Sequence, residues 1–305
     1  MSKLSMSPHI HCGRSTTGIM LDVLIALLPA AMAGVIIFGL TALWVILTCV
    51  ISCVGFEALF RLLFKSTQSV QDLSAAVTGL LLGLNLPANI PLWQCVVGSL
   101  FAIIVVKCLY GGLGHNVVNP AIAARVFMLV AFASVAKAAF PVDVDTVAGA
   151  TPLAPNAEMP GLTTLATGFY GGAIGETCSI ALLVGGLYLL VRRVITWHNP
   201  VAFIGTVFLF SFFMEGNDPV KALSMVLCGG VMLGAIFMAT DYVTSPPTPW
   251  GKVIFGIGCG LLTCLIRYFG GYPEGVSFAI LFMNILNPYV CKWTQHKVFG
   301  KGGVK

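Results

Sequence analysis

The chain has 305 residues, of which 58% are hydrophobic and only 9% are charged, and its formal net charge is +5. About 25% of the residues in an ordinary soluble domain are charged, so this chain lacks the polar residues that would cover a soluble surface. The composition excludes a cytosolic enzyme, a disordered chain and a nucleic-acid-binding domain. It indicates an all-α polytopic membrane protein in the lipid bilayer, with a single membrane domain over residues 1–305.

Ten apolar segments are candidates for membrane-spanning helices, each of which needs about 20 mostly apolar residues. The first two form one stretch that is too long for one helix and divides at Gly39, and the third is short and ends at Pro87. In chain order, the ten segments are 19–38, 40–60, 73–86, 92–110, 120–140, 172–191, 200–214, 222–239, 252–269 and 275–293.

The basic residues indicate the orientation of these ten segments, because Lys and Arg gather in cytoplasmic connections. If the N-terminus is cytoplasmic, Lys137, Lys221 and Arg267 lie outside. Twelve basic residues then lie inside: Lys3, Arg14, Arg61, Lys65, Lys107, Arg192, Arg193, Lys252, Lys292, Lys297, Lys301 and Lys305. We therefore expect both termini in the cytoplasm and residues 141–171 on the outer side.

A faint internal repeat relates the two halves of the chain. Pro91-Leu92-Trp93, an apolar segment, Lys107 and Gly111-Gly112 correspond to Pro249-Trp250, an apolar segment, Arg267 and Gly270-Gly271. Five spans in each half give the copies opposite topology, and inverted repeats with broken helices commonly place a site between two bundles. We expect one half over residues 1–140 and the other over residues 172–305.

The long connection between the halves, residues 141–171, holds a threonine in an open setting. Gly149 and Ala150 precede Thr151, and Pro152 favours an extended backbone at that threonine. A hydroxyl so placed can be esterified, although a Gly-Ala-Thr string also occurs by chance in a chain rich in Gly and Ala.

Several longer stretches resemble the D-subunit family of the Rnf complexes, which is similar to the B subunit of the sodium-pumping NADH:quinone oxidoreductase. The stretches cover nearly the whole chain: residues 7–9, DVLIALLPA (22–30), SAAVTGLLLGLNLP (74–87), KCLYGGLGHNVVNPA (107–121), GATPL (149–153), GGAIGET (171–177), FMATDYVTSPPT (237–248) and YPEGVSFAILFMN (272–284). The resemblance implies a membrane flavoprotein subunit of an ion-pumping ferredoxin:NAD oxidoreductase, in the plasma (inner) membrane of a prokaryote.

The resemblance also implies a covalent FMN, joined through its phosphate to a threonine hydroxyl by a flavin transferase. Thr151 matches the acceptor and Asp145 lies six residues before it, whereas Ala148 stands where Ser or Thr is common. Related complexes are thought to hold a second, noncovalent flavin, such as riboflavin, in this subunit. The implied partners are an exported FMN subunit, two membrane iron–sulfur subunits, and cytoplasmic subunits on the ferredoxin and NAD sides.

Four further residues are candidates for flavin or ion contacts, because ionisable or polar groups inside or beside spans are often functional. Asn119 either caps the helix that follows it or contacts a flavin ring. Arg125 either pairs with an acid or binds the flavin phosphate, and Glu176 either caps a helix N-terminus or lines a pocket. Asp241 lies in a polar, broken stretch before Pro246-Pro247.

No catalytic side chain and no metal site are expected. The five histidines form no helical pair, and nine of the ten cysteines lie in apolar runs, with no CxxC motif in the sequence, which is typical of packing residues. Two other functions remain open. An inverted repeat of broken helices also suits a stand-alone transporter or channel of the urea or ammonium permease type, and the chain could serve as a scaffold of a complex.

Overall fold

The computed structural model describes residues 15–64, 72–135, 139–141, 153, 159–270 and 275–295. Its described part is helical, apart from one isolated antiparallel bridge between Ala139 and Gly172. The all-α class expected from composition is therefore confirmed for these residues.

The first half of the chain contributes five helical segments. The helix α1 begins after Ser15, whose side chain accepts a hydrogen bond from the Gly18 amide, and it ends at Gly39, where φ is 76°. Only a residue without a Cβ adopts such a backbone freely, and this confirms the predicted division at Gly39. The segments are α1 (Thr16–Phe38), α2 (Leu40–Phe64), α3 (Ser74–Leu84), α4 (Leu92–Leu100) with its π-helical continuation η2 (Phe101–Cys108), and α5 (Pro120–Ala131).

The second half follows a short helix in the long connection, α6 (Leu162–Thr167). Its segments are α7 (Ser179–Val191), α8 (His198–Met214), α9 (Pro219–Leu227), α10 (Val231–Leu233) with the π-helical η3 (Gly234–Met238), α11 (Pro249–Phe269) and α12 (Val276–Thr294).

Three predicted segments differ from the observed helices. In the segment 172–191, the helix α7 begins only at Ser179. The segment 120–140 ends as a helix at Ala131, because the next residue, Phe132, has an extended backbone. The segment 222–239 is not one straight helix, because α9 and the α10–η3 unit meet at an angle of 67°. The sequence signals this break only through the pair Gly229-Gly230, and Gly229 has a φ of 69°.

Three helices of the described part, α1, α2 and α11, are long and apolar enough to cross a membrane, and the bent α9–α10–η3 unit adds a fourth if it counts as one span. Five further apolar helices of the described part are shorter, with 10 to 17 residues, and α12 has 19 residues. Length and composition therefore identify three or four complete spans among the described residues, and the ten-span inverted repeat stays a prediction.

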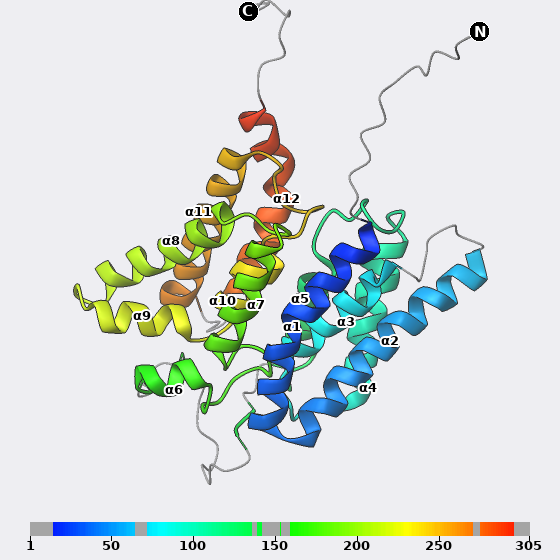
Figure 1. Ribbon diagram of the computed structural model, residues 1–305, viewed down its shortest axis with the longest axis horizontal. Helices are drawn as coiled ribbons and strands as arrows, with labels where there is room; N and C mark the ends of the chain where they lie inside the picture. Colours follow the sequence, from blue (N-terminus) through cyan, green and yellow to red (C-terminus); the bar gives the residue numbers. More distant parts are fainter. Residues whose placement is uncertain are drawn as a thin grey trace, which may run out of the picture.

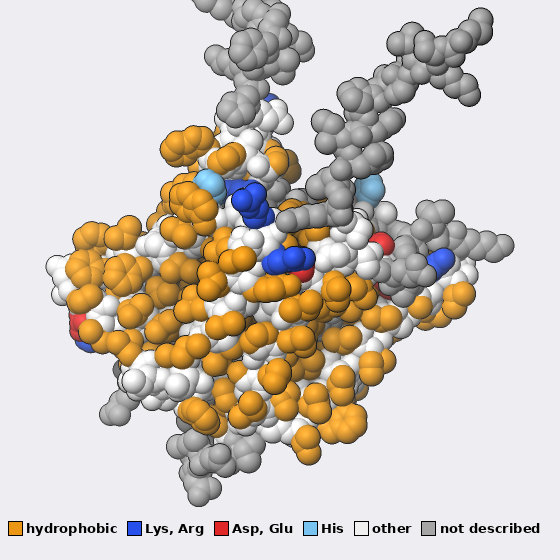
Figure 2. Space-filling model, viewed as in Figure 1, with side chains coloured by type: hydrophobic (Ala, Val, Ile, Leu, Met, Phe, Trp, Pro, Cys, Tyr) orange, Lys and Arg blue, Asp and Glu red, His pale blue; other side chains and the backbone are white. Residues whose placement is uncertain are grey.

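The helices form two groups, α1–α5 on one side and α8–α12 on the other, with α7 packed against α1 between them (Figure 1). The beginning of α1 and the end of α12 lie at one end of the molecule, and α6 lies at the opposite end. Large hydrophobic side chains cover much of the outer surface (Figure 2). An apolar surface of this extent is expected where lipid is the solvent.

Candidate functional site

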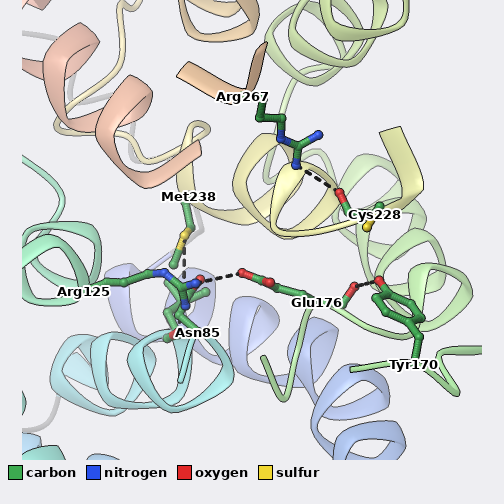
Figure 3. Close-up of polar contacts among 8 residues, drawn as sticks. Asn85, Arg125, Tyr170, Glu176, Cys228, Met238 and Arg267 are labelled. Carbon is green, nitrogen blue, oxygen red and sulfur yellow. Dashed lines mark hydrogen bonds and ion pairs between the residues drawn. The ribbon is translucent and has the colours of Figure 1, made fainter. Parts of the chain in front are cut away.

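The break between α9 and α10 is the centre of a polar cluster (Figure 3). Its backbone carbonyls accept hydrogen bonds from side chains outside the helix. Arg267 Nη1 donates to the Met225 carbonyl at 2.7 Å and Nη2 donates to the Cys228 carbonyl at 3.0 Å. Ser179 Oγ donates to the Leu227 carbonyl at 3.2 Å. The break is thus satisfied by protein groups, as an interrupted helix in a membrane requires.

Tyr170 joins this break to the end of the long connection. Its hydroxyl lies 3.2 Å from the Glu176 carbonyl oxygen and 3.4 Å from the Leu227 carbonyl oxygen. Burial raises the pKa of the Tyr170 phenol well above its ordinary value. The phenol therefore stays protonated at neutral pH, and its hydroxyl serves as a hydrogen-bond donor. The segment that follows the connection is therefore fixed against α9.

Arg125 and Glu176 form a buried ion pair between the two halves of the chain. Arg125 Nη2, on α5, lies 3.2 Å from Glu176 Oε1, and the two side chains are 2% and 3% exposed. The same carboxylate also lies against the α9–α10 break, because Glu176 Oε1 would be 2.7 Å from a Cβ added to Gly230. Of the two interpretations of Arg125, the structure therefore shows the ion pair.

Glu176 lies two residues before the N-cap of α7. That N-cap is Cys178, whose own side chain makes no cap hydrogen bond. The Glu176 carboxylate pairs with Arg125, and its helix-cap interpretation stays a prediction.

A second polar group lies at the C-terminal end of η3, and it consists of amide side chains from several helices. Asn119 Nδ2 donates to the Met238 carbonyl at 3.3 Å, and Asn85 Nδ2 lies 3.3 Å from the Met238 sulfur. Asn199 Nδ2 donates to the Ala239 carbonyl. When the Asn284 carboxamide is oriented to satisfy both partners, its nitrogen donates to the Thr244 carbonyl at 3.2 Å. Its oxygen accepts from the backbone N–H of Asn119 at 3.2 Å.

Asn119 also confirms the capping prediction. Its Oδ1 accepts hydrogen bonds from the Ala121 and Ile122 amides at 3.0 and 3.4 Å, at the first turn of α5. Because both ends of this carboxamide are engaged, Asn119 links the start of α5 to the end of η3 and is a structural residue in this conformation.

Asp241 shares a small cavity of about 70 Å³ with Asn119 and with residues of α1, α3 and α7. Asp241 Oδ2 accepts a hydrogen bond from the Thr244 hydroxyl at 2.9 Å. Desolvation raises the pKa of the Asp241 carboxyl above its ordinary value of 3.8, although hydrogen bonds from Thr244 and the neighbouring backbone oppose the shift. The structure thus brings Asp241 and Asn119 to one cavity.

A second buried ion pair, between Lys107 and Glu57, lies within the first half of the chain. Lys107 Nζ lies 2.6 Å from Glu57 Oε1 and 2.7 Å from Ser74 Oγ, and the Lys107 and Glu57 side chains are almost fully buried. Lys107 is thus fixed to α2 and to the first residue of α3. Sequence reasoning singled out Lys107 but missed its partner, because Glu57 has no neighbouring signal along α2.

The proposed flavin acceptor Thr151 lies outside the described residues, as do Asp145, Gly149 and Ala150. Leu153, two residues after Thr151, is described. It packs with Leu165, Tyr170, Leu227 and Cys228, and its Cδ1 and the Nη2 of Arg267 would each lie 2.8 Å from a Cβ added to Gly229. Leu153 therefore lies beside Arg267 at the α9–α10 break.

Neither metal ligation nor disulfide formation is seen in the described part of the chain. It contains no group of three His, Cys, Asp or Glu side chains that could hold a metal ion, and its nine cysteines are free thiols. Seven of the nine are buried, which is the behaviour of small packing residues.

Comparisons with known proteins agree with this architecture. The family model described as "NQR2, RnfD, RnfE family" matches residues 3–300. The D subunit of the Na(+)-translocating ferredoxin:NAD(+) oxidoreductase complex of Acetobacterium woodii is 46% identical, over 99% of this chain and 96% of that protein. The D subunit of the proton-translocating complex of Clostridium ljungdahlii is 40% identical, over 97% and 96%. The D subunit of the ion-translocating oxidoreductase complex of Cronobacter sakazakii is 36% identical, over 98% and 99%.

Proposed function

This chain belongs to the NQR2, RnfD, RnfE family, with the D subunits of Rnf complexes among its relatives, and on that premise we propose that it is the electron-carrying D subunit of a membrane redox pump. In this proposal the chain passes electrons between ferredoxin and NAD within an assembled complex, coupled to export of a cation. The names of two relatives specify sodium and protons, respectively. Full-length similarity to subunits with this activity carries the proposal.

We further propose that FMN is attached to Thr151 through a phosphoester made by a flavin transferase. A flavin exchanges one or two electrons and so connects one-electron carriers to a two-electron acceptor. The surroundings of Leu153 suit a phosphoester. Arg267 Nε is buried and has no hydrogen-bond partner among the described residues, and a guanidinium is well suited to bind a phosphate anion.

The chain's own groups would fix the position of this loop. Leu153, two residues after Thr151, and Tyr170, near the end of the connection, both pack at the α9–α10 break, and Arg267 binds the carbonyls of that break. The Arg125–Glu176 pair joins the same break to α5 in the first half. A tethered cofactor would therefore be attached next to a part of the membrane domain that these contacts hold in place. Electron transfer requires such a fixed cofactor position.

The ten-segment inverted repeat remains part of the proposal. The faint repeat aligns Lys107 with Arg267, and each of these cations binds a short helix of its own half. Lys107 donates to Ser74 at the start of α3, and Arg267 donates to the Cys228 carbonyl at the end of α9. The position of α6 at the end of the molecule opposite to the start of α1 and the end of α12 (Figure 1) supports an exported loop and cytoplasmic termini.

No residue is assigned to a second flavin. The cavity between Asn119 and Asp241 has a volume of about 70 Å³, whereas pockets for ligands of this size usually have roughly 300–1,000 Å³. In addition, the Asn119 carboxamide is already engaged by protein groups.

The test of the covalent flavin is in-gel fluorescence of the denatured subunit. The complex is expressed with its flavin transferase, and Thr151→Ala is compared with Thr163→Ala, a control in α6. We expect a yellow-fluorescent band for the wild type and the control, and none for Thr151→Ala. A colourless wild-type chain that transports a solute in proteoliposomes without partners would instead identify a permease.

A further inference from the structure

A cavity of about 300 Å³ opens at the end of the molecule where α1 begins and α12 ends. It lies between the connection after α7 and the connection between η3 and α11. The cations Arg193 and Lys252 line it, together with Thr196, Ser245 and the Pro246-Pro247 turn, and no carboxylate is among its described lining residues. A volume of this size is within the usual range of ligand pockets.

Hydrogen-bond donors for an anion converge on this cavity. Lys252 Nζ donates to Thr196 Oγ1 at 3.0 Å, which uses one of the three N–H groups of the ammonium. The Thr196 hydroxyl accepts this bond and still has its own proton to donate. The cavity also includes Asn199, in the first turn of α8, where the partial positive charge of a 17-residue helix favours an anion.

An apolar groove continues from the polar cavity along the outer surface. It has a volume of about 230 Å³, is lined by Leu183, Leu187, Leu190, Val201 and Ile204, and shares Ile195 with the polar cavity. Leu187 and Val201 are strongly exposed. A polar, cationic cavity that opens into an apolar groove matches a molecule with an anionic head and a hydrocarbon chain.

The neighbouring residues place this junction at the boundary between lipid and water. Trp197 and Trp250, one in each of the two segments that line the cavity, are 59% and 74% exposed, and Trp is enriched where a membrane protein meets the headgroup region. Figure 2 shows Lys and Arg side chains gathered above the apolar surface at this end. Basic pockets of this kind between transmembrane helices bind anionic lipid head groups.

We propose that this junction is a binding site for an anionic phospholipid. The head-group phosphate is held by Lys252, Arg193 and Thr196, and one acyl chain lies in the groove beside Ile195. The site lies at the end of the molecule opposite to α6 and shares no lining residue with the surroundings of Leu153, so its test is independent of the proposed flavin.

The test measures the lipid retained by the assembled complex. The complex is equilibrated in detergent with equal amounts of phosphatidylglycerol and phosphatidylcholine, freed of excess lipid, and its bound lipid is quantified by mass spectrometry. We expect phosphatidylglycerol to be enriched. Arg193→Gln with Lys252→Gln should lower the retained amount by about 25-fold, since each Lys or Arg contributes roughly fivefold at an anionic membrane surface.

Three variants control this measurement. Lys292→Gln removes an exposed cation at the end of α12 and should leave retention within about twofold, whereas Lys252→Arg should preserve it. Ile195→Trp, which fills the groove, should lower retention of a long-chain lipid. Gel filtration of each complex checks that it remains assembled.

Four outcomes would overturn the proposal. They are equal retention of the two lipids, unchanged retention in the double variant, absence of bound phosphatidylglycerol from the wild-type complex, and full displacement of the lipid by an equal concentration of inorganic phosphate. The last outcome would identify a site for a free anion.

Discussion

Arg125 and Glu176 are 51 residues apart in sequence, yet their side chains form an ion pair of 3.2 Å in which both are almost fully buried. Arg125 belongs to α5 in the first half, and Glu176 precedes α7 in the second half. The pair lies against Gly230 at the break between α9 and α10. It therefore links both halves to the region that we propose to support the flavin loop.

Removing one member of this pair should strongly destabilise the chain. Glu176→Leu leaves the Arg125 guanidinium without its carboxylate in a buried setting, and breaking a buried pair typically costs about 3–5 kcal/mol. The double variant Arg125→Leu/Glu176→Leu should recover much of that loss, because it leaves no unpaired charge. Thermal denaturation followed by size-exclusion chromatography compares the wild-type complex, Glu176→Leu and the double variant. A double variant less stable than Glu176→Leu would contradict this account.

Close packing of α1 on α7 depends on a residue without a side chain. A Cβ added to Gly185 would collide with the backbone carbonyl oxygen of Ala26 on α1, and backbone atoms cannot move aside as a flexible side chain can. We expect Gly185→Ala to lower the melting temperature of the complex. Gly205→Ala is the matched control, because a Cβ at that position meets nothing within 4 Å; equal melting temperatures for the two variants would refute the prediction.

Asp241 should make stability depend on pH. Desolvation raises the pKa of its carboxyl in the folded chain above the ordinary 3.8, so the folded state holds a proton that the unfolded state has already lost. Its contribution to stability is therefore lost as pH rises from about 3.8 through the folded pKa, and the loss persists at pH 7. Asp241→Asn should be more stable than the wild type at pH 7, with a difference that shrinks towards pH 4.

Asp218→Asn provides the control for the pH experiment. Asp218 is the half-buried N-cap of α9, and Asn serves as an N-cap equally well. Melting curves of the complex between pH 4 and 8 should show no comparable change for this variant. A wild-type curve parallel to that of Asp241→Asn over the whole range would disprove the assignment.

Substitution of Arg267 should lower the amount of covalently attached flavin, in addition to any effect on helix packing. Its guanidinium holds the Met225 and Cys228 carbonyls and lies near Leu153, so Arg267→Gln removes the proposed positive partner of the phosphoester. We expect several-fold less fluorescence per mole of denatured subunit, whereas Arg267→Lys should retain more of it. Arg61→Gln, at the end of α2, is the remote control, and normal labelling of Arg267→Gln would exclude this role.

The sequence predicted the helices well where the signal was local. Gly39 divided the first apolar stretch, and Asn119 marked the start of α5, because a residue with positive φ and an N-cap act on the few residues beside them. The sequence failed at Ala131, where α5 ends although the apolar composition continues, and at Gly229, where α9 bends away from α10. An apolar run does not reveal where its backbone hydrogen bonds will be interrupted.

The amino-acid sequence by itself determined that the chain is an apolar, helical membrane protein, because too few charged residues are present for any other surface. It also indicated which ionisable residues lie inside the apolar segments. Only the tertiary structure decided their partners: Arg125 with Glu176, Lys107 with Glu57, and Arg267 with the carbonyls of the broken helix. Those partners lie 39 to 51 residues away along the chain, and a buried charge takes its partner from whichever helix packs against it, which no local pattern encodes.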